Sequence, residues 1–324
     1  MPFWKQPSPE EQQRRMQEQQ DAEASRRALE TGGLPLQATR RLSEETAAGH
    51  PLFTSDLSTK EFSLTRTLGY QPLSQVMGSS IYHVGWQYTQ TYAPDPSARE
   101  LTTLTHAHQQ AAQLALSRLD QEAALLKAHG VIGVRLTTRD YEWGRDMLEF
   151  TAIGTAIKLP NTPLPQRPFL SDLSGQEFWT LLQAGYYPIG IVTGYCAYYI
   201  CLGSTLAVQM GNWYRSRNQE MTPFSKGIST ARKLAMKRVV DMARNLKAVG
   251  VVGVHIGCDR NIIEYETDKP VRYYMDLCVR FSIIGTAITA QRPDHVIPSP
   301  RPTLTLTDLR PGRYGATQEL TMRI

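Results

Sequence analysis

Hydrophobic and polar residues alternate along this chain in a pattern that occurs twice. Residues 55–85, SDLSTKEFSLTRTLGYQPLSQVMGSSIYHVG, align without a gap on residues 171–201, SDLSGQEFWTLLQAGYYPIGIVTGYCAYYIC. Twelve of the 31 aligned positions are identical. Two further motifs recur in the same order, namely GVIGVR at 130–135 against GVVGVH at 250–255, and IGTAI at both 153–157 and 284–288. The chain therefore contains an internal duplication.

Each copy predicts the same series of elements. Ser58 with Glu61, and Ser174 with Glu177, have the spacing of a capping box that starts a short helix. An apolar stretch after a glycine then predicts a first strand. A long helix follows, at about 101–128 in the first copy and 228–248 in the second, and two more strands complete the copy. In the second long helix, one apolar stripe is expected to face the core, formed by Ala231, Ala235, Val239, Met242, Leu246 and Val249.

The last strand of each copy has an apolar side and a mixed side, because successive side chains point to opposite faces of a sheet. The apolar sides contain Leu148, Phe150, Ala152, Gly154 and Ala156, and Val279, Phe281, Ile283, Gly285 and Ala287. The mixed sides contain Glu149, Thr151, Ile153 and Thr155, and Arg280, Ser282, Ile284 and Thr286. One helix covers only one face, so we expect the mixed face to contact another module or subunit. Glu149 and Arg280 are equivalent positions of opposite charge, and we expect them to pair across such a contact.

Glycines mark the junction between each long helix and the next strand. We expect Gly130 and Gly250 to adopt positive φ where the helix ends. We expect Gly133 and Gly253, which lack a Cβ, to let the helix or another backbone approach the strand closely.

These patterns predict an α+β fold of two tandem β-α-β-β modules. Each is a small antiparallel sheet packed on one long helix and preceded by a short capped helix, and its last strand lies between the other two. The predicted boundaries are a polar helical or disordered segment at 1–54, modules at 55–160 and 171–290, a proline-rich linker at 161–170 and a tail at 291–324.

Composition indicates an ordinary globular protein with a slight excess of positive charge. The 324 residues are 41% hydrophobic and 20% charged, and the net charge is +5. The basic residues that gather on one face of the second long helix are Arg232, Lys233, Lys237, Arg238, Arg244 and Lys247. A solvated face is the simpler interpretation, and contact with phosphates or an anionic membrane surface is the alternative. We do not expect nucleic acid as a partner.

The sequence favours a cytoplasmic location. Its first 20 residues lack the apolar core of a signal peptide. Residues 185–203 carry no formal charge, but their glycines, proline and tyrosines favour a buried strand over a membrane helix. The cysteines, Cys196, Cys201, Cys258 and Cys278, follow no disulfide spacing and are expected to be reduced.

No pattern typical of an enzyme occurs. The chain has no G-x-S-x-G, no P-loop and no dinucleotide fingerprint in its proper context, so we expect no catalytic residue and no cofactor. A divalent metal site is a weaker hypothesis, because the two copies differ at every candidate ligand. Its best cluster is Cys258, Cys278 and His255, on adjacent strands.

The combination of GY.P...V.G, A.G(V)VGV and GTAI resembles the YbjQ family. The matching residues are Gly69, Pro72, Gly78, Gly130, Gly133, Gly154 and Thr155, and Gly185, Pro188, Gly194, Gly250, Gly253, Gly285 and Thr286. The resemblance implies a dodecin-subunit-like fold and assembly into rings, typically pentameric, through the sheets. It also implies the heavy-metal-binding label that the family carries.

Taken together, these observations predict a non-enzymatic, homo-oligomeric scaffold or binding protein. The alternatives are heavy-metal binding or sequestration, and binding of anionic surfaces through the helix at 228–248. The N-terminal segment is a further candidate contact for a protein partner.

Overall fold

A computed structural model describes residues 8–48, 53–84, 98–140, 147–200, 220–267 and 272–290. The helices are α1 (Pro9–Glu30), α2 (Leu36–Ala47), α3 (Thr59–Thr67), α4 (Thr102–Leu125), α5 (Gly175–Gln183) and α7 (Thr222–Asn245). The strands are β1 (Gln71–His83), β2 (Arg99–Glu100), β3 (Gly130–Asp140), β4 (Met147–Lys158), β5 (Phe169–Leu170), β6 (Tyr186–Ile200), β7 (Gly250–Thr267) and β8 (Arg272–Ala290). Cys201 and the tail at 291–324 lie outside the described residues.

The molecule contains two four-stranded sheets, and their three long strands have the same order in both. The first sheet has the order β1-β4-β3-β5 and the second has the order β2-β6-β8-β7. In both, the last long strand of the module lies between the other two and pairs antiparallel with each, as predicted. Helix α4 covers one face of the first sheet and α7 covers one face of the second. Below, the face of each sheet that points away from its own helix is called its open face.

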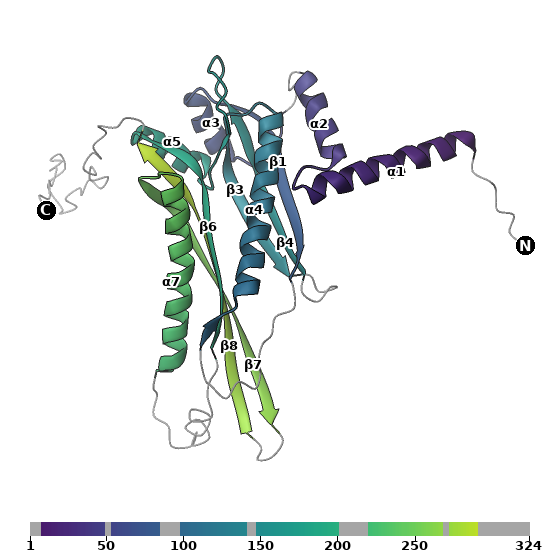
Figure 1. Cartoon of the computed structure of the whole chain (residues 1–324). Coiled ribbons are helices and arrows are strands. Elements are labelled where there is room, and N and C mark those ends of the chain that lie inside the picture. The colour runs from purple at the N-terminus through teal and green to yellow at the C-terminus, as the bar shows by residue number, and fades with distance from the viewer. Residues whose placement is uncertain are drawn as a thin grey trace, which may run out of the picture.

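Each module also adds a short strand to the sheet of the other. Strand β5, in the linker, pairs parallel with β3. Strand β2, which precedes α4, pairs antiparallel with β6. In addition, α4 contacts β6, so that α7, the second sheet and α4 lie side by side (Figure 1). The two modules are therefore joined through α4 and the two short strands.

The short helices α3 and α5 are capped as predicted. The Ser58 and Ser174 side chains accept from the amides of Glu61 and Glu177, and the glutamates accept from the serine amides in return. The two helices pack against each other, and the Gly175 amide donates to Glu61 Oε1 over 3.3 Å.

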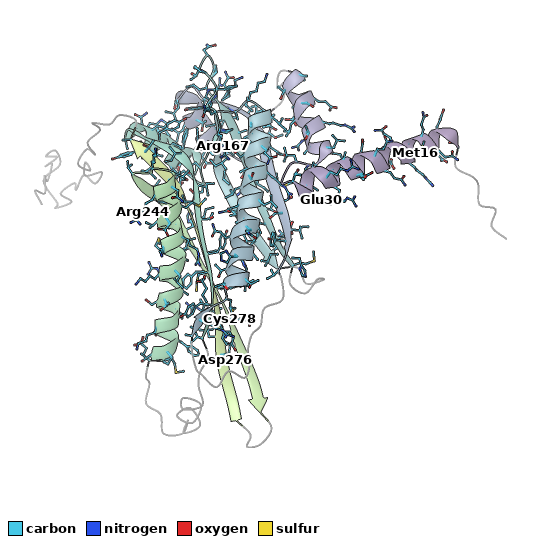
Figure 2. All side chains as sticks on the ribbon, in the orientation of Figure 1. Met16, Glu30, Arg167, Arg244, Asp276 and Cys278 are labelled. Carbon is cyan, nitrogen blue, oxygen red and sulfur yellow. The ribbon has the colours of Figure 1, made fainter. Side chains whose placement is uncertain are left out.

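The N-terminal segment forms two helices. Leu42 of α2 is fully buried in the core of the first module, so α2 is part of that module's packing. Helix α1 projects away from the sheets, and Met16 near its outer end is exposed (Figures 1 and 2).

Glycine has a different role at the strand junctions from the one expected. Positive φ occurs at Lys127 and Lys247, three residues before Gly130 and Gly250, and these lysines end the long helices. Gly133 and Gly253 have φ of 64° at the β-bulges of β3 and β7, a conformation that favours glycine. The close approach expected at Gly133 is absent, since a Cβ there would meet nothing within 4 Å among the described residues.

The close approach of helix and sheet occurs instead at Gly78 and Gly194. A Cβ at these positions would lie 2.0 Å from the carbonyl oxygen of Ala115 and 2.2 Å from that of Ala235. These two signature glycines therefore set the distance between each helix and the first strand of its sheet.

The second long helix differs from its prediction at both ends. It begins at Thr222, six residues earlier than expected, with Pro223 in its first turn. Leu246 and Val249 are exposed, so the apolar stripe ends at Met242. The uncharged stretch after Gly185 forms β6, as predicted, and no helix among the described residues is long and apolar enough to cross a membrane.

Candidate assembly surfaces and intermodule cleft

The GTAI threonine of each module anchors the chain just before the capped helix. Thr155 Oγ1 lies 3.3 Å from Ser55 Oγ and accepts from the Asp56 amide over 3.2 Å. In the second module, Thr286 Oγ1 lies 3.1 Å from Ser171 Oγ and accepts from the Asp172 amide over 3.0 Å. The SDL and GTAI motifs recur together because each copy needs both to fix its capped helix on the sheet.

A small acidic cavity lies where the two anchored segments meet. It has a volume of about 250 Å³ and includes Asp56, Glu61, Arg135, Asp172 and Glu177 in its lining. Burial opposes ionisation of Glu61, but hydrogen bonds from Ser58 and Gly175 outweigh it and lower the pKa of this carboxyl. Although four carboxyl groups line the cavity, the described residues contain no group of three His, Cys, Asp or Glu side chains placed to hold a metal ion.

Helix α4 covers strand β6 on the open face of the second sheet. Gln109 Nε2 donates to Thr193 Oγ1 over 3.2 Å, and Thr105 Oγ1 accepts from the Ala197 amide over 2.9 Å. The Tyr195 ring packs against the rings of His108 and Phe150, with centroids 6.0 and 5.7 Å apart. Tyr195 thereby belongs to the hydrophobic core of the first module.

The equivalent face of the first sheet is exposed. Met77 and Ile81 occupy the positions of Thr193 and Ala197 in the duplicated pattern. Met77 is 49% exposed and Ile81 is 56% exposed, whereas Thr193 and Ala197 are 0% and 3% exposed. The β6 part of one open face is thus buried within the chain, whereas the equivalent β1 part of the other presents large apolar side chains to solvent.

Glu149 and Arg280 do not lie on facing surfaces within the chain. Glu149 pairs with Ile81 and Arg139 in the first sheet and shares their open face. Arg280 belongs to the open face of the second sheet. That face meets α4, which packs on the face of the first sheet opposite to the one that carries Glu149. Glu149 and Arg280 therefore do not pair within one chain, because α4 lies between the sheets, and their pairing between subunits stays a prediction. The same separation applies to Thr151 and Ile153 on the first open face, and to Ser282 and Ile284 on the second. Ile284 packs against the core of the first module.

The candidate metal ligands are separated by the register of β7 and β8. Cys258 pairs with Phe281 and shares the face that α7 covers, whereas Cys278 pairs with Asn261 and Tyr199 on the open face. His255 is opposite Ile284, six residues along β8 from Cys278. Adjacent strands were expected to bring these three together, but side-chain alternation and register place them apart.

Arg118 and Arg238 each hold a strand on its helix, a role that the sequence pattern did not predict. Arg118 Nη1 donates to the Ser79 carbonyl over 2.6 Å, and Arg238 Nη1 donates to the Tyr195 carbonyl over 2.9 Å. Arg238 also forms an ion pair with Glu100 at 2.6 Å, so it joins α7 to both strands at the edge of the second sheet. Their equivalent positions in the two long helices are the sequence signal that could have indicated this shared role.

The other residues of the basic helix face remain on the surface. Arg244 lies 3.7 Å from Asp241, and the exposed members are Arg232, Lys233, Lys237, Arg244 and Lys247.

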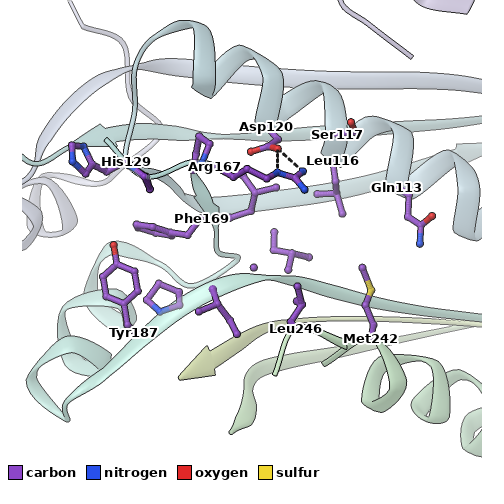
Figure 3. Close-up of a pocket in the computed structure, with 17 residues that line it drawn as sticks. Gln113, Leu116, Ser117, Asp120, His129, Arg167, Phe169, Tyr187, Met242 and Leu246 are labelled. Atoms are coloured by element: carbon purple, nitrogen blue, oxygen red, sulfur yellow. Dashed lines mark hydrogen bonds and ion pairs between the residues drawn. The ribbon is translucent and has the colours of Figure 1, made fainter. Parts of the chain in front are cut away.

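A larger cleft lies between the modules, with a volume of about 480 Å³ (Figure 3). It is bounded by α4, the linker, the start of β6 and the end of α7, and its walls include Leu116, Phe169 and Met242. Arg167 reaches from the linker to Asp120 Oδ2 over 2.7 Å. Buried polar atoms without a partner among the described residues include Asp120 Oδ1 and His129 Nε2, both on residues that line this cleft. Its size and apolar walls suit a small molecule.

The fold and the duplicated motifs define a known class of protein. Residues 97–160 belong to the YbjQ family, whose model, described as "Putative heavy-metal-binding", matches them. That range covers α4 and the strands on either side of it, and the likeness of residues 171–290 to the same family rests on the duplication.

The chain is also similar to a named protein, the Encapsulin nanocompartment protein Rv1762c of Mycobacterium tuberculosis. The two are 40% identical over 220 residues, which make up 66% of this chain and 80% of the relative.

Proposed function

We propose that this chain is a non-enzymatic, cytoplasmic protein that self-associates by packing its sheet-and-helix modules on one another. The observation that carries the proposal is the unequal burial of two equivalent faces. Inside the chain, α4 buries Thr193 and Ala197 of β6, while their counterparts Met77 and Ile81 on β1 remain exposed. Removing such side chains from water favours association, at roughly 25 cal/mol per Å² of apolar surface.

The relative supports the same function. Its name describes an encapsulin nanocompartment protein. We propose that the present chain also acts within an assembly, as a scaffold or binding subunit. The ring closure implied by the family resemblance remains a prediction.

Native mass measurement of the full-length protein tests this function. We expect integer multiples of the 36.4 kDa chain. A monomer at all concentrations up to tens of micromolar would contradict the proposal, because Met77 and Ile81 would then stay exposed to solvent.

Metal binding is the second candidate function, favoured by the family description. The same native spectra detect stoichiometric metal as added mass. A metal that persists in the Cys258→Ser and Cys278→Ser variants would have to be held by other residues. A metal lost in both variants would show that these thiols contribute despite their separation in this structure.

A further inference from the structure

The first turns of α4 show how one module covers another. Leu101, the N-cap of α4, donates its amide to the Ala197 carbonyl over 2.8 Å, and Thr105 one turn later accepts from the Ala197 amide. Leu101 and Leu104 also pack against Ala197 and Tyr199. The amide and the carbonyl of Ala197, which face the outer edge of β6, are thus both hydrogen-bonded to the first module.

Helix α7 presents an equivalent first turn, for which no hydrogen bond to the first module is found among the described residues. Both helices have 24 residues and begin at residues with nearly the same backbone angles, φ −85° and ψ 82° at Leu101 and φ −80° and ψ 74° at Met221. An offset of 120 residues places Met221 on Leu101 and Ser225 on Thr105. Ser225 is exposed, and no described residue accepts from the Met221 amide.

Strand β1 presents the matching edge. Its outward-facing groups at Met77 and Ser79 are bonded to side chains of α4, since the Met77 amide donates to Glu122 and the Ser79 carbonyl accepts from Arg118. The next outward-facing residue of an antiparallel strand is Ile81, the counterpart of Ala197. Its backbone groups on this edge have no partner among the described residues.

We infer that the first turns of α7 from one copy dock on β1 and the open face of the first sheet of a second copy. This contact between chains has the same geometry as the contact of α4 with β6 within one chain. The Met221 amide donates to the Ile81 carbonyl, Ser225 Oγ accepts from the Ile81 amide, and Phe224 with Ile228 covers Met77 and Ile81.

This interface joins two different surfaces, so it extends from copy to copy and closes only as a ring. The inference rests on the proposed self-association and adds which surfaces form it.

Two variants that each disable one surface test the inference in the full-length chain. Ile81→Asp places a charge on the β1 surface, and Ser225→Glu places one on the α7 surface. Each variant alone is expected to give monomers in native mass spectra, because every contact needs both surfaces. An equimolar mixture is expected to give complexes of two chains, since the intact α7 of the first variant fits the intact β1 of the second.

The matched control is Ile262→Asp, at a residue 57% exposed on β7. It is expected to assemble like the wild type. Assembly of either test variant at wild-type size, or the absence of a two-chain complex on mixing, would overturn the inference.

A photo-crosslinking amino acid at Met77 gives a measurement that does not depend on disrupting the protein. We expect the crosslinked peptide to lie within residues 221–232 of another copy. Wild-type oligomers crosslinked elsewhere would overturn this interface and leave self-association standing, whereas a monomeric wild type would remove both.

Discussion

Asp56 and Asp172 occupy the same position in the two modules but have different neighbours. Asp56 forms an ion pair with Arg135. The residue equivalent to Arg135 is His255, and Asp172 is bonded mainly to Thr286 while its Oδ2 atom is buried without a partner among the described residues. Burial is the largest cause of the rise in the pKa of Asp172 to about 6, which the hydrogen bond from Thr286 only partly offsets.

This difference predicts the pH dependence of stability. Because the folded-state pKa of Asp172 is raised, its protonated form stabilises the folded state below about pH 4, and this stabilisation is lost as the pH rises through 6. We expect Asp172→Asn to raise the free energy of unfolding at pH 7 by about 2 to 3 kcal/mol. Urea unfolding from pH 4 to pH 7.5 would show the gain of the variant shrinking towards pH 4.

Asp56→Asn is the matched control at the residue scale. It removes the ion pair with Arg135, whose side chain is 67% exposed, so a loss of about 0 to 1 kcal/mol at pH 7 is expected. If both variants raised the free energy of unfolding by the same amount, the environment of Asp172 would not explain the effect of Asp172→Asn.

At the scale of elements, the crossing of each long helix over its sheet depends on one glycine. We expect Gly78→Ala and Gly194→Ala each to lower the free energy of unfolding by about 1 to 3 kcal/mol or more, because the added methyl groups would overlap a helix carbonyl. Denaturant midpoints would measure the loss. Gly190→Ala serves as control, since its Cβ would meet nothing closer than 3.5 Å, and a comparable loss there would rule out overlap as the cause.

The sequence predicts elements well where the signal is local and repeated. The capping boxes, the strand order and the apolar side of β4 all follow from spacing that occurs in both copies. The positive φ at Lys127 and Lys247 was assigned to Gly130 and Gly250 instead, because a lysine in the left-handed conformation carries no signal in its residue type. The relative placement of Cys258 and Cys278 was missed because a bulge and a strand register decide it.

At the scale of the whole molecule, the sequence predicts the modules but not how they meet. The outer face of α4 contains Thr105 and Gln109, which indicate a solvated surface when read as a pattern. In the structure they form hydrogen bonds to β6, and β2 and β5 each complete the sheet of the other module. The two modules consequently share one continuous set of contacts, which is expected to unfold as a single cooperative unit.

Thr105→Val tests this coupling with little change in side-chain shape. The valine cannot accept from the Ala197 amide, which then stays buried without a partner, at a cost of about 1 to 3 kcal/mol. Because the contact lies between modules, we expect one unfolding transition shifted to lower denaturant, with faster amide exchange in β4 as well as in β6. Thr103→Val, at an exposed position in the same turn of α4, is expected to leave both unchanged. Two separate transitions, of which only one responds to Thr105→Val, would instead indicate modules that fold independently and merely touch through α4.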